Sequence, residues 1–127
     1  MIEQRKVIRL ETLAGVAIKG LKQGQALLKD ISVTGCRAEC PKDAGVEKNS
    51  HCILEIIPEE KTSIKSFELL AEAKWVKNGL ESMEIGFFIL EFPKDLQFQY
   101  YVDYLAWRYA QEGRNIGVKN TGNYPAG

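Results

Sequence analysis

The chain has 127 residues, of which 45% are hydrophobic and 9% are aromatic, so it is long enough for one domain with a hydrophobic core and too short for two ordinary domains. Seventeen Lys and Arg residues balance seventeen Asp and Glu residues, which argues against a protein that holds long nucleic acid or an anionic membrane mainly by charge. A small anionic ligand remains compatible with this balance, because a local arginine cluster needs no overall excess of positive charge.

The start of the chain and its cysteines indicate a cytoplasmic location without membrane insertion. No apolar run approaches the roughly 18 residues of a spanning helix, and the charged first six residues lack the apolar segment of a signal peptide. Cys36, Cys40 and Cys52 form an odd set in a chain without an export signal, which favours reduced thiols over a disulfide framework.

Residues 1–12 are expected to form a basic N-terminal arm. Arg5, Lys6 and Arg9 lie close together there, and the apolar residues show little alternation. We therefore expect a mobile arm that can close on an anionic ligand, ahead of a β-rich region over residues 13–92.

The first half of this region contains three short segments with β patterns. Residues 13–18 and 25–31 are separated by glycine-containing sequence, and residues 35–40 end at a proline. Residues 42–50, with a glycine, an asparagine and several charges, are expected to form a surface loop.

The later strands have clearer signals. Residues 52–57 are an apolar, β-branched run that predicts a well-buried strand. Residues 67–75 alternate with period two, and one face carries Phe67, Leu69, Ala71, Ala73 and Trp75. Asn78-Gly79 predicts a type I′ hairpin turn into residues 82–92. The apolar face of that last strand carries Met83, Ile85, Phe87 and Ile89.

Six strands with hairpin-length connections predict a mainly β fold, a six-stranded antiparallel barrel whose closure removes exposed strand edges. A helix is expected after it over residues 93–113, because Pro93 suits a helix start and Gly113 a stop, with no glycine or proline between them. Residues 114–127 are expected to be a flexible tail.

The expected helix carries two apolar stripes at helical spacing. The first is predicted to cap the barrel and consists of Phe98, Tyr101, Val102, Leu105 and Tyr109. The second, on roughly the opposite face, consists of Leu96, Tyr100, Tyr104 and Trp107. Large aromatic residues are unusual on a face that meets only water, so the second stripe is a candidate dimer or partner interface. The alternative is that loops or the tail fold over it.

Two short motifs carry the functional prediction. Arg5 and Arg9 are four residues apart in the arm, and Asp30-x-Ser32-x-x-Gly35 follows at the end of an expected strand. In this order and spacing the two motifs resemble the PilZ domain family, whose members bind cyclic di-GMP. Residues 73–76 and 86–89 are similar to late strands of the family, so the resemblance covers most of residues 5–92.

The resemblance implies a receptor without catalytic activity. Arg5 and Arg9 would wrap around the nucleotide, while Asp30, Ser32 and Gly35 would receive it on the barrel surface. The residue types suit such a ligand, because arginine offers a planar fork to guanine O6 and N7 or to phosphate and also stacks on bases. An aspartate can accept from the guanine N–H groups, a serine can supply a hydroxyl, and a glycine admits a close backbone approach.

Other functions receive less support. Cys36, Cys40, His51 and Cys52 contain zinc-binding atoms, but their spacing on extended segments is poor, and buried thiols are the favoured interpretation. The chain carries no phosphate-binding loop or nucleophile-elbow motif. The sequence also lacks the stripe of aromatic and basic residues that is usual in an oligonucleotide-binding barrel. The main alternative is an interaction scaffold of the same fold that acts through the second helix stripe without using the nucleotide.

Overall fold

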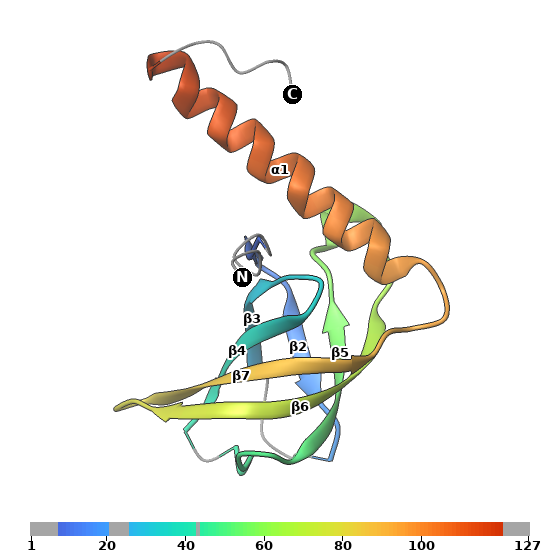
Figure 1. Cartoon of the computed structure of the whole chain (residues 1–127), viewed down its shortest axis with the longest axis vertical. Coiled ribbons are helices and arrows are strands. Elements are labelled where there is room, and N and C mark those ends of the chain that lie inside the picture. The colour runs from blue at the N-terminus through green and yellow to red at the C-terminus, as the bar shows by residue number, and fades with distance from the viewer. Residues whose placement is uncertain (1–7, 21–25, 43, 121–127) are drawn as a thin grey trace, which may run out of the picture.

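The computed structural model describes residues 8–20, 26–42 and 44–120 (Figure 1). Its elements in chain order are β1 (Leu10–Glu11), β2 (Gly15–Ile18), β3 (Ala26–Ile31), β4 (Gly35–Pro41), β5 (His51–Ile57), the 3-10 turn η2 (Glu60–Thr62), β6 (Phe67–Asn78), β7 (Ser82–Glu91) and α1 (Gln97–Asn120). Strands dominate, and the long helix comes last.

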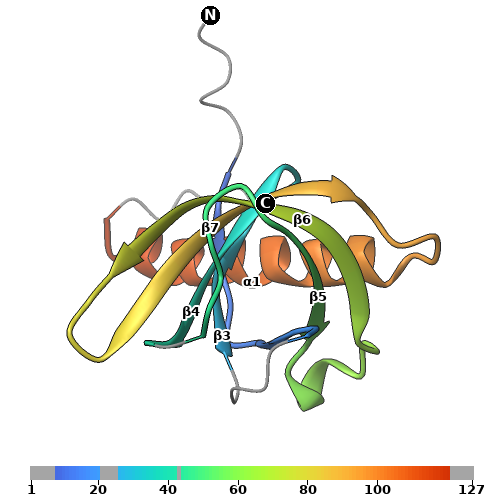
Figure 2. The same ribbon diagram turned by 90° about the horizontal axis from the view of Figure 1, so that it is seen from below.

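The six strands from β2 to β7 form a closed antiparallel barrel. The hydrogen-bonded order is β3-β2-β5-β6-β7-β4, and the additional pairing of β4 with β3 closes the ring (Figure 2). The seventh strand, β1, pairs with β3 beyond the end of β2, through Leu10 with Ile31 and Glu11 with Asp30. The predicted mainly β, six-stranded antiparallel barrel with a C-terminal helix is confirmed. Within the expected arm over residues 1–12, Leu10 and Glu11 form β1, and residues 1–7 lie outside the described chain.

The core follows the period-two pattern of the long strands. The apolar face predicted for β7 is wholly buried, as are Phe67, Leu69, Ala71 and Ala73 of β6. The strand over residues 52–57 was predicted to be well buried, and this is wrong. Only Leu54 and Ile56 enter the core, whereas Ile53 and Ile57 are 41% and 45% exposed. An antiparallel barrel leaves one face of each strand toward solvent, so an apolar run can still alternate.

A β-bulge moves Trp75 to the outer face, although the sequence pattern placed it in the core. The register of β6 against β7 shifts between Ala73, opposite Phe87, and Trp75, opposite Gly86. One extra residue reverses the alternation, so Trp75 is 41% exposed. Its indole ring lies against Gly86, where a Cβ atom would overlap the ring.

The β6–β7 hairpin is confirmed, but its turn is not the expected type I′. That turn requires positive φ at both central residues, and neither Asn78 nor Gly79 has a positive φ. Asn78 is instead the last residue of β6, and the Gly79 N–H donates to the Ser82 carbonyl at 2.8 Å.

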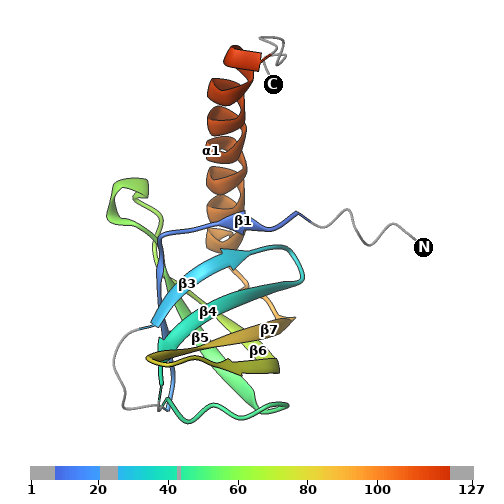
Figure 3. The ribbon, with the colours of Figure 1, turned by 90° about the vertical axis from the view of Figure 1, so that its left-hand side faces the viewer.

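Helix α1 covers one end of the barrel (Figures 1 and 3). Phe98, Tyr101 and Leu105 are buried, as predicted for the capping stripe, but Tyr109 is 59% exposed because the helix projects beyond the barrel. No helix in the part of the chain described above is long and apolar enough to cross a bilayer.

Both predicted helix boundaries are wrong. The helix begins at Gln97, whose N–H donates to the Asp95 carboxylate at 3.1 Å, rather than at Pro93. It also continues through Gly113 to Asn120, because one glycine in a helix costs only about 1 kcal/mol relative to alanine and does not force a stop. Residues 114–120 are therefore helical rather than a flexible tail, and residues 121–127 lie outside the described chain.

Candidate functional site

A second β-bulge places Asp30 on the outer surface of the barrel. Along β3, Leu28 pairs with Ala38 and Asp30 pairs with Arg37, so Lys29 is the extra residue. Strict alternation from the buried Leu28 would aim Asp30 into the core. The bulge reverses the alternation, so Ile31 enters the core and Asp30 faces outward beside Arg37.

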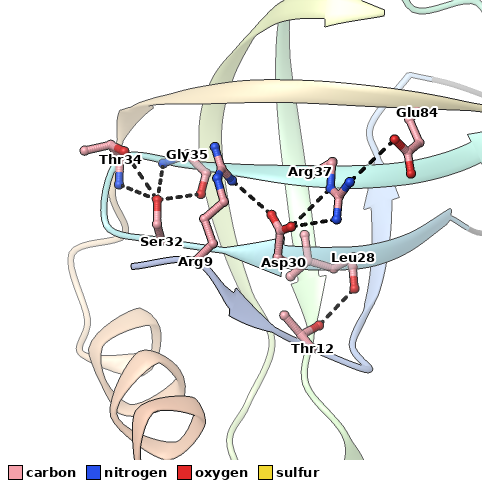
Figure 4. Close-up of polar contacts among 9 residues, drawn as sticks. All are labelled: Arg9, Thr12, Leu28, Asp30, Ser32, Thr34, Gly35, Arg37 and Glu84. Carbon is pink, nitrogen blue, oxygen red and sulfur yellow. Dashed lines mark hydrogen bonds and ion pairs between the residues drawn. The ribbon is translucent and has the colours of Figure 1, made fainter. Parts of the chain in front are cut away.

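The Asp30 side chain is only 8% exposed, and its carboxylate contacts two arginines (Figure 4). The Arg9 Nη1 atom lies 3.0 Å from Oδ1, while Nε and Nη2 of Arg37 lie 3.1 Å and 2.9 Å from Oδ2. Arg37 also reaches the Glu84 carboxylate at 3.7 Å, so one chain of charges crosses β3, β4 and β7. A carboxylate this deeply buried needs such partners, because desolvation disfavours its charged form.

Ser32 organises the turn between β3 and β4. Its hydroxyl oxygen accepts the N–H groups of Thr34 and Gly35, each at 3.2 Å, and the hydroxyl donates to the Gly35 carbonyl at 3.2 Å. The side chain is only 2% exposed. These bonds satisfy the backbone of the turn and fix its shape, as serine commonly does at turns.

Gly35 is required by the packing of the barrel. A Cβ atom at this position would overlap the carbonyl oxygen of Phe87 on β7, the strand that pairs with β4. Sequence reasoning attributed the glycine to a close approach of a ligand, but the neighbour that needs the space is the β7 backbone.

Four of the five predicted ligand-binding residues can be placed. Asp30, Ser32 and Gly35 belong to one strand end and turn, and Arg9 reaches the same carboxylate from the residue before β1. Arg5 lies outside the described residues. The Arg9 side chain is 56% exposed, so it remains accessible to a ligand while it contacts Asp30.

Sequence reasoning missed Arg37. It lies two residues after Gly35, so the alternation of β4 puts both on the outer face of the barrel. That spacing could have indicated that Arg37 lies on the outer face near Gly35. Its pairing with Asp30, however, depends on the bulge in β3, and the sequence gives no sign of that bulge.

Two grooves adjoin the cluster formed by Asp30, Arg9 and Arg37. One, of about 300 Å³, has Lys29, Arg37 and the apolar side chains of Leu13 and Leu27 in its lining. The other, of about 240 Å³, lies between β1 and α1 and is lined by Arg9, Glu11, Leu105, Arg108, Tyr109 and Glu112. Arginine therefore contributes to both grooves, and a planar guanidinium suits phosphate oxygens and base edges.

The cysteines near this region are protonated at neutral pH. Burial, together with the smaller effect of the nearby Asp30 charge, raises the pKa of Cys36 to about 12. Burial likewise raises the pKa of Cys40 to about 11. Within residues 8–20, 26–42 and 44–120, no three His, Cys, Asp or Glu side chains gather in a way that could hold a metal ion.

Comparison with known proteins finds similarity at the level of structure. No protein-family model matches the chain, and no curated protein sequence matches it. The inhibitor of motility MotI/DgrA from Bacillus subtilis superimposes with a TM-score of 0.72 at 20% identity, over 87% of this chain and 53% of that protein. YcgR from Escherichia coli, solved in complex with c-di-GMP, superimposes with a TM-score of 0.62 at 15% identity, over 91% of this chain and 50% of that protein.

This chain spans about half the length of each of these two proteins. At such identities the likeness concerns the fold, which agrees with the resemblance carried by the arginine pair and the Asp-x-Ser-x-x-Gly turn. The chain therefore has the fold of a PilZ-like domain.

Proposed function

We propose that the chain is a cytoplasmic, non-catalytic receptor domain that binds cyclic di-GMP through Arg5, Arg9, Asp30, Ser32 and Gly35. The observation that carries this proposal is the 3.0 Å contact between Arg9 and Asp30, because it joins the two motifs across 21 residues of sequence. The structural likeness to YcgR, which was solved with c-di-GMP, supports the same ligand class.

The contacts of Asp30 suggest how a ligand enters. Arg9 exchanges Asp30 for a phosphate or a guanine edge of the nucleotide, because both offer acceptors to its planar fork. Arg37 stays beside Asp30 and keeps the buried carboxylate paired during this exchange. One oxygen of Asp30 then becomes available to guanine N–H donors. Arg5 supplies a second fork from the arm.

Ser32 and Gly35 act in this proposal mainly through the backbone. The Ser32 hydroxyl is already bonded within the turn, so it fixes the surface on which the nucleotide lies. The arm closes over that surface and changes what the domain offers to a partner protein, which is a change driven by different ligand affinities of two states.

Calorimetric titration of the full chain with cyclic di-GMP tests the proposal. We expect saturable binding, together with a smaller hydrodynamic radius as the arm closes. GMP serves as the control, because it presents one base and cannot span two arginine forks. Absence of heat and of any change in size with cyclic di-GMP would refute the receptor function.

A second candidate function is supported by the outer face of α1. Tyr100 and Trp107 of α1 are 49% and 58% exposed, and Leu96, which directly precedes the helix, is 59% exposed, although Tyr104 is half-buried and packs against Tyr101. These residues fit a scaffold that binds a protein partner or a second copy of the chain whether or not the nucleotide is present.

Sedimentation distinguishes this alternative for self-association. A dimer through α1 should weaken in a Tyr100→Ala/Trp107→Ala variant and persist in Leu80→Ala, which removes a 91%-exposed apolar side chain from the β6–β7 turn. Equal association with and without cyclic di-GMP favours the scaffold. A monomer at every concentration argues against a homodimer.

A further inference from the structure

The C-terminal helix contacts the strand that follows Arg9. The Nη2 atom of Arg108 in α1 donates to the backbone carbonyl of Glu11 in β1 at 2.6 Å, and Nη1 contacts the Glu59 carboxylate at 3.3 Å. The Arg108 side chain is only 19% exposed. This guanidinium therefore joins three segments that are remote in sequence, at the end of the barrel where α1 lies above β1 (Figure 3).

Strand β1 is short, and apart from Arg108 it is fixed by its pairing with β3 and by Leu10, which is buried in the core. It is two residues long, and its register pairs Glu11 with Asp30 and Leu10 with Ile31. The next residue, Thr12, donates its N–H to the Lys29 carbonyl at 3.1 Å. Arg9 directly precedes this strand, so a small shift of β1 changes where the Arg9 guanidinium can reach.

Glu59 aims Arg108 at β1. Its carboxylate accepts the Tyr101 hydroxyl at 2.7 Å through Oε1 and faces Arg108 through Oε2. Tyr101 is fully buried, so the carboxylate is anchored to the base of the helix. With Nη1 held on Glu59, the planar guanidinium turns Nη2 toward the Glu11 carbonyl.

We propose that Arg108 is a positioning residue for Arg9. It holds β1 in place, and this keeps the Arg9 guanidinium beside Asp30. The inference rests on the proposed function and extends it, because it couples the nucleotide site to α1. Displacement of Arg9 by a ligand shifts β1, and the Arg108 bond transmits that shift to the helix. Such coupling is reciprocal, so any partner that moves α1 also changes nucleotide affinity.

Three variants separate this role from general support of the fold. Arg108→Met keeps a long apolar stem beside the Tyr104 ring, which the guanidinium now overlies at 5.8 Å, but it removes both donors. Glu59→Gln removes the charge of the ion pair that docks the helix but keeps a side-chain oxygen that can accept from Arg108, so the Arg108 bond to Glu11 stays in place. Arg108→Lys restores one donor for the Glu11 carbonyl without the fork.

Nucleotide titration and hydrogen exchange give independent measurements on these variants. We expect Arg108→Met to weaken cyclic di-GMP binding about tenfold, the scale of one charged hydrogen bond. Glu59→Gln should stay within about twofold of the wild type, and Arg108→Lys should recover part of the loss. Exchange of the Thr12 amide, measured without nucleotide, should accelerate in Arg108→Met and not in Glu59→Gln.

The possible results lead to different conclusions. Unchanged affinity in Arg108→Met, or an equal loss in Glu59→Gln, would overturn the positioning role. If the wild type binds no nucleotide, the receptor function fails, and the Thr12 amide alone decides the inference. If the Thr12 amide then exchanges faster in Arg108→Met than in Glu59→Gln, the result supports the role of Arg108 in holding β1. Equal exchange rates in these two variants overturn it.

Discussion

Asp30 and Arg37 lie directly opposite each other on β3 and β4, and Nε and Nη2 of Arg37 both contact the same carboxylate oxygen, Oδ2. The other oxygen, Oδ1, contacts Arg9. One buried carboxylate thus holds a guanidinium fixed on the barrel and another on the N-terminal segment. Arg9 can leave for a ligand without leaving Asp30 unpaired, and this division of roles can be tested.

Removal of Arg37 should impair both stability and binding. In Arg37→Ala, Asp30 stays buried with Arg9 as its remaining cationic partner, so we expect the free energy of unfolding to fall by about 1 to 2 kcal/mol. Cyclic di-GMP affinity should fall as well, because Arg9 can no longer leave Asp30 without cost. Urea unfolding and calorimetry measure the two effects. Glu84→Gln, which removes only the 3.7 Å contact, is the matched control and should change both values little.

Substitution of Arg9 should affect binding more than folding. Its side chain is 56% exposed, so Arg9→Ala should cost little stability, but it should weaken cyclic di-GMP binding by about 1 to 3 kcal/mol. Arg9→Lys should cost less than Arg9→Ala, because lysine keeps the charge and loses the fork. Calorimetry on both variants, with the exposed Lys77→Ala as a charge-matched control, measures the difference. Equal affinity in all three variants would contradict the proposed contact.

Gly35 and Gly15 provide a matched pair of substitutions. In Gly35→Ala the new methyl group meets the Phe87 carbonyl, so β4 and β7 must separate, and we expect a loss of about 1 to 3 kcal/mol of stability. In Gly15→Ala the methyl group would lie 4.0 Å from the Ile57 Cβ, an ordinary contact, so stability should change little. Thermal unfolding of the two variants tests this, and similar melting temperatures would refute the packing argument.

The buried thiols should make stability fall at alkaline pH. The pKa of Cys36 is raised from 9.0 to about 12 and that of Cys40 to about 11, both chiefly by burial. Above pH 9 the unfolded chain loses these protons while the folded chain keeps them, so the free energy of unfolding falls as pH rises toward 12. Denaturant unfolding from pH 8 to 11 should show this decline, and it should be shallower in Cys36→Ala.

Thiol labelling provides an independent check on the same burial. Cys52 is half-buried, so iodoacetamide at pH 8 should modify it before Cys36 and Cys40. Mass spectrometry of the intact protein over time would follow the three sites. Early modification of Cys36 would contradict its buried position.

The sequence was sufficient for the barrel because most strands keep strict alternation. It failed where an extra residue enters a strand. The bulge at Lys29 turns Asp30 outward, and the bulge between Ala73 and Trp75 exposes the indole ring. Neither position carries a glycine or another local signal, since the partner strand sets the register.

For the candidate site, the sequence indicated which residues come together better than it indicated their contacts. The two motifs identified Arg9 and Asp30, which the structure brings together. Ser32 and Gly35 were assigned to a ligand, but their closest contacts lie within the turn and with β7. Contacts between distant strands and the helix, such as that of Arg108 with Glu11, have no signature in a single sequence.

The β3–β4 turn joins the two strands whose pairing closes the barrel, so its residues are needed for folding whether or not a ligand binds. Ser32 and Gly35 would be kept by selection for folding alone. Without the hydrogen bonds of Ser32 and the close packing of Gly35, the strand pairing that closes the barrel would be weaker. If the proposed receptor function were lost, the arginines of the N-terminal segment would be free to change, whereas Ser32 and Gly35 would be retained. The arginines are therefore the better mark of a working receptor.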